Sequence, residues 1–171
     1  MSGSNRLLKE YKEILAAASR SEGGSSGDIV LFPPDASNLY AWSAHILGPP
    51  DTPYAGHWFT LRIQVPKQYP LAPPKVMFVT RVCHPNVHFK SGEICLDVLK
   101  DAWTPIWTLE STCRAIIALL GTPDATSPLN CDISNLYRAG DFLGATSLIR
   151  MYTLDFASQT LPPVNTLQRQ M

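Results

Sequence analysis

One cysteine in the middle of the chain has the surroundings of a reactive group. Cys95 follows a polar turn at 90–93 and lies in the apolar run 94–99, and the tripeptide HPN at 84–86 precedes it. A cysteine thiol is a good nucleophile because part of it ionises near neutral pH. An isolated cysteine between apolar neighbours is, however, often a buried core residue. The residues around Cys95 leave both interpretations open.

Two possible chemistries for this segment are a zinc site, in which other ligands lie beside the thiol, and a cysteine hydrolase, in which a base does. Cys83, His84, His88 and Cys95 are all zinc-ligand types within one short stretch. The paired CxxC spacing that makes a zinc signal specific is absent. A cysteine hydrolase would instead need a histidine within hydrogen-bond reach of the thiol and a third group that orients it. No protease signature surrounds Cys95, so neither hypothesis is specific.

A third chemistry needs little beyond the thiol itself. A cysteine that carries an acyl group as a thioester requires an exposed sulfur and a nearby amide to stabilise the oxyanion that forms on attack. Asn86, which precedes Cys95 by a short segment, is a candidate for that amide. A scarcity of bases around the sulfur also suits a carrier, because bases would promote hydrolysis of the thioester.

The composition is that of a folded domain without a strong charge preference. The 171 residues are 45% hydrophobic and 16% charged, and the formal net charge is +0 at pH 7. This balance favours one globular domain and gives no argument for a nucleic-acid or anionic-membrane partner. No apolar run reaches the roughly 20 residues of a membrane-spanning helix, and the charged N-terminus is unlike a signal peptide. Four widely spaced cysteines are typical of a reducing compartment.

The apolar pattern predicts a sheet between helices. Apolar residues at helical spacing predict a first helix over 5–18. Short connections rich in Pro and Gly then separate runs that favour strands paired as an antiparallel meander. These predicted strands are 29–32, 39–47, 58–65 and 76–79.

Helices are predicted again after the Cys95 segment. Thr108 and Asp141 are candidate N-caps, and a short helix is predicted over 131–138. The fold class is therefore α+β: an N-terminal helix, a four-stranded antiparallel meander, an active-site loop, and C-terminal helices packed on one sheet face. The domain is predicted to span 1–157. The stretch 19–27 is predicted to be a flexible loop, and 158–171 a loosely ordered tail.

Several short motifs resemble those of the ubiquitin-conjugating enzymes across residues 5–157. Each motif is weak alone, but together, in the family's order and spacing, they are specific. In that family the fold is the UBC fold, so the resemblance agrees with the α+β prediction. The motifs are G-P-x-D-[ST]-P-Y-x-G at 48–56, Y-P-x-x-P-P-K-V at 69–76, HPN at 84–86, G-x-I-C-L-D at 92–97, W-[ST]-P at 103–105 and S-P-L-N at 127–130.

The resemblance implies a role for each active-site residue. Cys95 matches the cysteine that receives the C-terminal carboxyl of ubiquitin from an activating enzyme as a thioester and passes it to a lysine or cysteine. Asn86 matches the family asparagine, which stabilises the oxyanion, supports the active-site loop, or does both. His84 and Pro85 are expected to be architectural, and Asp97 to stabilise a turn. No cofactor is expected for this chain, because the activating enzyme uses the ATP.

One departure from the family pattern concerns the acceptor. Ser127 stands where many members have an acidic residue that helps an attacking lysine lose its proton. A thiol acceptor needs less help of that kind, so a substrate cysteine is an expected alternative to lysine.

The resemblance also implies a docking surface for RING-type ubiquitin ligases. Its residues come from the first helix and from two loops, and Leu71 stands where many members carry phenylalanine. We call this set the docking surface; it consists of Arg6, Pro70, Leu71, Pro105 and Ile106.

Within the family, the runs VCHPN at 82–86 and WTPIWTLEST at 103–112 most resemble the fungal peroxin-type, peroxisomal branch. This implies a membrane-anchored peroxisomal tether protein as partner and the peroxisomal import receptor as substrate during receptor recycling. The chain would then be cytoplasmic, on the cytosolic face of the peroxisomal membrane and not inserted in it. The alternatives are a general cytosolic or nuclear conjugating enzyme and a non-catalytic ubiquitin-binding variant, although such variants lack the cysteine.

The family fold also raises the hypothesis of a disulfide. Cys83 directly precedes the HPN motif and Cys131 follows the S-P-L-N motif, and in this fold the two loops flank the same opening. A Cys83–Cys131 bond is therefore a hypothesis, which four free thiols counted without reductant would reject.

Overall fold

The computed structural model describes residues 3–20 and 27–164, and it has the predicted α+β architecture. Helix α1 (Gly3–Arg20) is followed by a sheet, the 3-10 turn η1 (Asp97–Leu99) and three further helices. The fold class predicted from the sequence is confirmed. The strands are β1 (Ile29–Phe32), β2 (Ala41–Leu47), β3 (Trp58–Gln64) and β4 (Lys75–Phe78), and the later helices are α2 (Leu109–Gly121), α3 (Cys131–Arg138) and α4 (Phe142–Phe156).

The sheet is a meander in which each strand pairs with the next. The order is β1-β2-β3-β4, and all three pairings are antiparallel. Strand β3 shows why the sheet has a buried face: Phe59, Leu61 and Ile63 are buried, whereas Arg62 and Gln64 are exposed. This alternation follows from the period of two in an extended strand.

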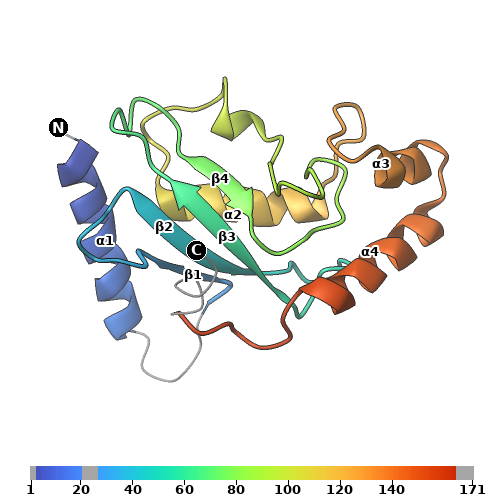
Figure 1. Cartoon of the computed structure of the whole chain (residues 1–171), viewed down its shortest axis with the longest axis horizontal. Helices are drawn as coiled ribbons and strands as arrows, with labels where there is room; N and C mark the ends of the chain where they lie inside the picture. The colour runs from blue at the N-terminus through green and yellow to red at the C-terminus, as the bar shows by residue number, and fades with distance from the viewer. Residues whose placement is uncertain (1–2, 21–26, 165–171) are drawn as a thin grey trace.

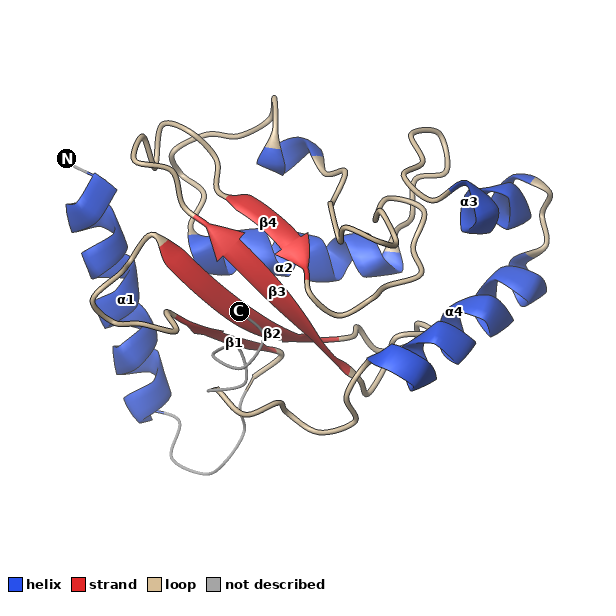
Figure 2. Ribbon diagram, viewed as in Figure 1, coloured by secondary structure: helices blue, strands red, loops and turns tan. Residues whose placement is uncertain are grey.

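Helix α2 lies across one face of the sheet, as Figure 2 shows, and supplies the other half of the core. Leu109, Cys113 and Ile116 are fully buried on its inner side. Its start is fixed by a capping box: Thr108 Oγ1 accepts from the Ser111 N–H at 3.1 Å, and Ser111 Oγ accepts from the Thr108 N–H at 2.9 Å. Of the C-terminal helices, α2 covers the sheet face, while α3 and α4 lie beyond one end of the sheet (Figure 1).

Helix α1 lies at the opposite end of the sheet (Figure 1), and only some of the apolar residues whose helical spacing predicted it are buried. Leu7 is fully buried, and the Tyr11 ring meets the Trp42 ring edge-on with 5.8 Å between centroids. Leu8 and Leu15 are 42% and 49% exposed. The reason is geometric: an apolar face wide enough to include both Leu8 and Leu15 is wider than the contact between α1 and the sheet, so these two side chains remain in solvent.

Two predicted segments fall partly outside the described residues. Residues 21–26 of the predicted loop and 165–171 of the predicted tail are among those not described. Ser158, in the described part of the tail, pairs with β3: the Trp58 N–H donates to the Ser158 carbonyl at 2.7 Å, and the Ser158 N–H returns a bond of 3.2 Å. Across residues 3–20 and 27–164, no helix has both the length and the apolar character needed to cross a membrane.

Candidate active site

Cys95 directly follows a short hairpin that is tied to the edge of the sheet. Val87 and Ile94 form its antiparallel bridge, and the Phe78 N–H of β4 donates to the Gly92 carbonyl at 2.9 Å. Gly92 has a φ of +73°, and a Cβ at this position would overlap the Phe78 carbonyl. Only glycine therefore allows the hairpin to approach β4 this closely. The Cys95 N–H then donates to the Asn86 carbonyl at 2.8 Å, which fixes the backbone of the reactive residue.

The HPN segment is buried, and the chemistry of its partners determines the protonation of His84. His84 Nδ1 accepts from the Asn86 N–H at 3.0 Å, and His84 Nε2 donates to the Leu119 carbonyl at 2.9 Å. Because an amide N–H only donates and a carbonyl only accepts, the ring is neutral with its proton on Nε2. Burial lowers the pKa of His84 to about 4, which agrees with that assignment.

Asn86 uses its side-chain amide to hold the loop on the other side of the opening. Its Nδ2 donates to the Asp124 carbonyl at 2.7 Å and to the Ser127 carbonyl at 3.4 Å, while its Oδ1 accepts from the Asp124 N–H at 2.8 Å. The side chain is buried, with 1% of the residue exposed. The structure thus brings Asn86 and Ser127 together through the Ser127 backbone, whereas the Ser127 side chain is in an exposed residue. An oxyanion role for Asn86 requires one N–H to leave a carbonyl, and the 3.4 Å bond is the weaker of the two.

Pro85 contributes through its backbone. The Pro85 carbonyl accepts from the Leu129 N–H at 2.8 Å and from the Asn130 N–H at 3.1 Å. The HPN segment is therefore bonded to the loop that leads into α3 at two places, through the Asn86 side chain and through the Pro85 backbone. We call the combination of residues 84–86, Cys95 and the loop 124–127 the active-site mouth.

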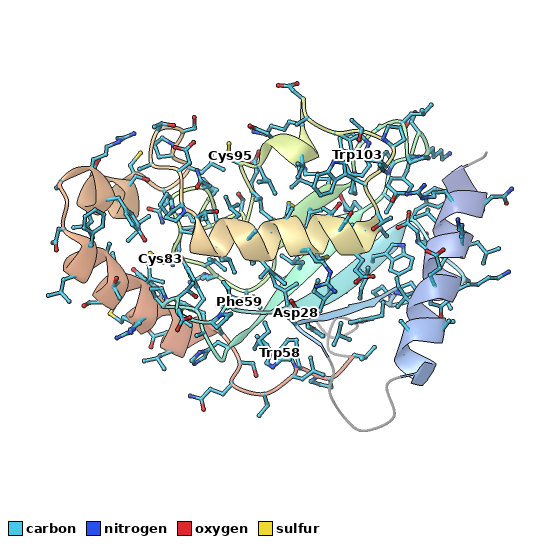
Figure 3. The ribbon with its side chains drawn as sticks, turned by 180° about the vertical axis from the view of Figure 1, so that it is seen from behind. Asp28, Trp58, Phe59, Cys83, Cys95 and Trp103 are labelled. Atoms are coloured by element: carbon cyan, nitrogen blue, oxygen red, sulfur yellow. The ribbon has the colours of Figure 1, made fainter. Side chains whose placement is uncertain are left out.

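Cys95 itself is half-exposed and has one polar neighbour. The Lys100 ammonium lies 3.6 Å from the Cys95 sulfur. The turn η1 causes this approach, because its tight i to i+3 bonds bring Lys100 back towards the residue where the turn began. Asp97 starts the turn, and its carbonyl accepts from the Lys100 N–H at 2.9 Å, while its own carboxylate is exposed. In Figure 3, Cys95 lies beside η1, with Trp103 further towards α1.

The structure separates the residues of the zinc and hydrolase alternatives. His84 is bonded to Leu119 and Asn86, and exposed His88 bonds through Nδ1 to the Ser91 N–H at 3.1 Å. Neither ring has a hydrogen bond to the Cys95 sulfur. Over the described ranges, no three His, Cys, Asp or Glu side chains are grouped in a way that could hold a metal ion.

The suggested Cys83–Cys131 disulfide is not formed. All four cysteines are free thiols; Cys83 is buried and Cys131 is exposed. Burial, assisted by the negative charge of Asp132, raises the pKa of the Cys83 thiol to about 12. Cys83 therefore behaves as a core residue, and its carbonyl accepts from the Tyr54 hydroxyl at 2.7 Å.

The docking surface predicted from the sequence has two exposed apolar tips. Leu71 is 80% exposed and Ile106 is 83% exposed, and Pro105 is also exposed. Pro70 is half-buried, and its carbonyl accepts from the Trp103 indole N–H at 2.8 Å, which ties the two loops together. Large apolar side chains held this far into solvent are typical of an interaction site when they gather on one surface.

Beneath this surface lies a charged network that sequence reasoning missed. The Glu10 carboxylate is buried and accepts from Arg6 Nε at 2.6 Å, from the Tyr69 hydroxyl at 2.7 Å and from the Leu109 N–H at 2.9 Å. Arg6 also donates to the Trp107 carbonyl at 3.1 Å, and its bond to Glu10 raises the pKa of the guanidinium. Glu10 thus joins α1, the 69–71 turn and the N-terminus of α2. The sequence does hold a signal for the burial of Glu10: it lies three residues after Leu7 and four before Ile14, and so on the apolar side of the helix.

A half-exposed cysteine beside the hydrogen-bonded side chains of His84 and Asn86 fits the geometry of an acyl carrier, and comparison with known proteins supplies the family. The family model described as "Ubiquitin-conjugating enzyme" matches residues 6–142. The chain belongs to the ubiquitin-conjugating enzyme family. It is an enzyme of ubiquitin conjugation, as the motifs around Cys95 predicted.

Several relatives of this ubiquitin-conjugating enzyme carry names of the peroxin-4 type. "Ubiquitin-conjugating enzyme E2 pex4" of Dictyostelium discoideum is 56% identical over 148 residues, which cover 86% of this chain and 95% of the relative. "Protein PEROXIN-4" of Arabidopsis thaliana is 54% identical over 148 residues, covering 86% and 90% of the two chains. The predicted likeness to the peroxin type is confirmed, and it extends to organisms other than fungi.

A solved structure agrees with the relatives. The H. polymorpha ubiquitin-conjugating enzyme Pex4p, crystallised in complex with the soluble domain of Pex22p, superposes with a TM-score of 0.85 at 35% sequence identity. The match covers 92% of this enzyme and 100% of that chain. The UBC fold of the enzyme therefore extends over almost the whole described structure.

Proposed function

We propose that Cys95 accepts ubiquitin from an activating enzyme as a thioester and passes it to a substrate lysine or cysteine. The observation that carries this proposal is the contrast at the active-site mouth. Cys95 is half-exposed and its sulfur has no histidine bonded to it, whereas the side chains of His84 and Asn86 behind it are fully engaged in hydrogen bonds. A stable thioester needs this combination of an open sulfur, a fixed backbone and no general base beside the reacting atoms.

A charging assay tests this proposal, with an exposed cysteine as the matched control. The full chain is mixed with ubiquitin, activating enzyme and ATP, and samples are compared with and without thiol reductant. We expect a reductant-sensitive adduct of one ubiquitin in wild type and in Cys131→Ala, and none in Cys95→Ala. An adduct that persists in Cys95→Ala would reject Cys95 as the carrier. No adduct in wild type would favour the non-catalytic alternative.

For the substrate, we propose the peroxisomal import receptor, with receptor recycling as the process. The support is the similarity to peroxin-4 relatives, together with Ser127 at a position where an acidic side chain would help a lysine acceptor. Pre-charged enzyme should discharge to free cysteine at least about tenfold faster than to free lysine at equal concentration and neutral pH, because far more of the thiol is deprotonated. The loss of the enzyme–ubiquitin thioester is followed with each acceptor on gels run without reductant. Faster discharge to lysine than to cysteine would reject a cysteine substrate.

For the location, we propose attachment to the cytosolic face of the peroxisomal membrane through a membrane-anchored tether protein. The support is that the related Pex4p was crystallised with the soluble domain of Pex22p. An apolar stripe on α4 is the proposed contact surface: Leu143, Met151 and Leu154 are 81%, 47% and 63% exposed. These residues are spaced to lie along one side of the helix, away from the side that packs on the core.

Binding of a purified tether domain tests this location. Leu154→Asp should weaken binding by more than about tenfold, because a carboxylate would be buried in an apolar contact. Leu71→Asp is the matched control, since Leu71 is also an exposed leucine but lies on the docking surface. Equal binding by both variants would reject the α4 stripe, and no binding by wild type would favour the general cytosolic or nuclear alternative.

A further inference from the structure

The loop between α2 and α3 forms one side of the active-site mouth, and its backbone is bonded to Asn86. The Asn86 side chain bonds to the Asp124 N–H at 2.8 Å, to the Asp124 carbonyl at 2.7 Å and to the Ser127 carbonyl at 3.4 Å. Asp124 Oδ1 also accepts from the Thr126 N–H at 2.8 Å, which closes the loop on itself. The position of this loop therefore decides where the Asn86 amide lies.

Arg138 holds the same loop from another element. Its Nη2 donates to the carbonyl of Ala125 at 2.7 Å, although the two residues are 13 positions apart. Arg138 is the last residue of α3, where a cation would favour the carbonyls of its own helix end. None of the ion pairs between described residues includes Arg138, so no described carboxylate competes for its guanidinium. A charged donor makes its bond to the loop stronger than a bond between neutral groups.

The helix that carries Arg138 is a firm support for this bond. Where the chain enters α3, the N–H groups of Leu129 and Asn130 donate to the Pro85 carbonyl at 2.8 and 3.1 Å. Further along the helix, Ile133 is fully buried. The Arg138 side chain is exposed, but it starts from a helix that is fixed to the HPN segment and to the core. It can therefore hold the loop in one position.

We propose that Arg138 is a positioning residue for transfer from Cys95, which keeps the loop 124–127 in place while the Asn86 amide donates to the oxyanion. The inference rests on the proposed thioester at Cys95 and on the oxyanion role of Asn86. In that role one N–H of the amide leaves a loop carbonyl, and the 3.4 Å bond is the weaker one. The loop then has fewer bonds to Asn86, whereas the bond between Arg138 and Ala125 is unaffected.

A variant without this bond should be slow in transfer rather than unstable. Arg138→Met has a side chain of similar length but no N–H donor. A displacement of about 1 Å in a group that stabilises the transition state can cost about 100-fold in rate. The bonds between Asn86 and Asp124 limit the displacement here, so we expect discharge about tenfold slower than in wild type. The urea midpoint should change little, because Arg138 is exposed.

The experiment charges the full chain with ubiquitin, stops charging by removing ATP, and follows single-turnover discharge to free cysteine on gels run without reductant. Wild type, Arg138→Met, Asn86→Ala and the double variant are compared. Arg150→Met is the matched control, since Arg150 is also an exposed arginine but lies on α4, and it should discharge at the wild-type rate. Because discharge is followed after charging is complete, the rate reports only the second step.

The double variant shows whether Arg138 acts through Asn86. When the amide is absent, the loop has nothing left to position for the oxyanion, so the double variant should discharge within about twofold of Asn86→Ala alone. Amide exchange of uncharged Arg138→Met gives an independent measurement. The Asp124 N–H should exchange faster than in wild type, because its loop has lost the bond to α3.

The results that would overturn the inference differ from those that would overturn the carrier. If wild type forms no thioester, the carrier proposal fails and the inference fails with it. If Arg138→Met charges and then discharges at the wild-type rate, Arg138 does not position the loop, and the carrier stands. If the double variant is about tenfold slower than Asn86→Ala, Arg138 acts independently of Asn86. Unchanged exchange at Asp124 would overturn the inference even if Arg138→Met charges poorly.

Discussion

Beneath the active-site mouth the buried polar groups are neutral, whereas beneath the docking surface they are charged. At the mouth, the His84 ring and the Asn86 amide bond almost entirely to backbone groups. Under the docking surface, the Glu10 carboxylate accepts hydrogen bonds from Arg6, from the Tyr69 hydroxyl and from the Leu109 N–H. Both networks hold exposed side chains in place, but they should respond differently to mutation and pH.

The difference follows from what each network must join. The mouth joins loops to one another, and neutral amide and imidazole groups match backbone donors and acceptors there without bringing a charge close to the reacting atoms. The docking surface joins three separate elements, and one carboxylate accepts several bonds at once. The cost is that Glu10 needs all its donors, since a buried charge without partners is strongly unfavourable.

The largest effect on stability is expected from Glu10→Ala. The change leaves the Arg6 guanidinium, the Tyr69 hydroxyl and the Leu109 N–H without their acceptor, and should reduce the free energy of unfolding by about 3 to 4 kcal/mol. Urea unfolding measures it. Glu13→Ala on the same helix is the control and should change stability by less than about 0.5 kcal/mol, because its pair with Lys9 is long and exposed. Equal effects from the two variants would contradict the Glu10 network.

The next effect comes from protonating His84. Its native pKa is about 4, compared with the ordinary value of 6.5, so the unfolded chain binds more protons between these two values. The stabilisation is complete above pH 6.5 and is lost as the pH falls towards 4, by about 3 kcal/mol in total. Burial lowers the pKa of His45 too, which adds a loss of the same sign. Urea midpoints measured across this range should fall, and NMR should place the His84 pKa near 4; a value near 6.5 would contradict a buried, neutral ring.

A smaller loss of stability is expected from Asn86→Ala. The Asp124 N–H and carbonyl, which meet the buried Asn86 amide at a partly exposed loop, lose their partner, which should cost about 1 to 2 kcal/mol. The Asp124 amide proton should also exchange faster with solvent. Asn135→Ala, on the exposed side of α3, is the control for removing an asparagine side chain. Unchanged protection at Asp124 would show that the amide does not hold the loop.

The smallest effect on stability is expected at the tips of the docking surface. Ile106→Ala should change the free energy of unfolding by less than about 0.5 kcal/mol, because the side chain is 83% exposed. It should nevertheless weaken stimulation by a RING-type ligase by about fivefold or more, as expected when an interface anchor is removed. Leu154→Ala serves as the control, since it removes an exposed apolar side chain from α4. A loss of more than about 1 kcal/mol of stability in Ile106→Ala, or normal stimulation by the ligase, would contradict a role of Ile106 in docking alone.

The sequence predicted the elements well because they depend on local patterns. The strand 29–32 and the helix 131–138 have the predicted bounds, and Thr108 and Asp141 cap their helices as expected. Periodicity and capping are properties of neighbouring residues, so one sequence is enough to find them.

The contacts that define the site depend on residues far apart in the chain. Glu10 is 99 residues from its partner Leu109, and Asn86 is 38 residues from Asp124. A hydrogen bond between residues so far apart in the chain leaves no repeating pattern in the sequence by which it could be predicted. Lys100 is a different case: it is near Cys95 in the chain, but the approach depends on η1, a turn too short for an apolar pattern to reveal.

The role of Asn86 is tested most directly by comparing the discharge of pre-charged Asn86→Ala with that of the wild type, at a temperature at which both are folded. We expect the Asn86 amide both to fix the active-site mouth and to stabilise the oxyanion that forms when an acceptor attacks the Cys95 thioester. The variant should therefore charge normally and discharge to a free acceptor about 100-fold more slowly in a single turnover. Discharge at the wild-type rate, with normal charging, would contradict this role.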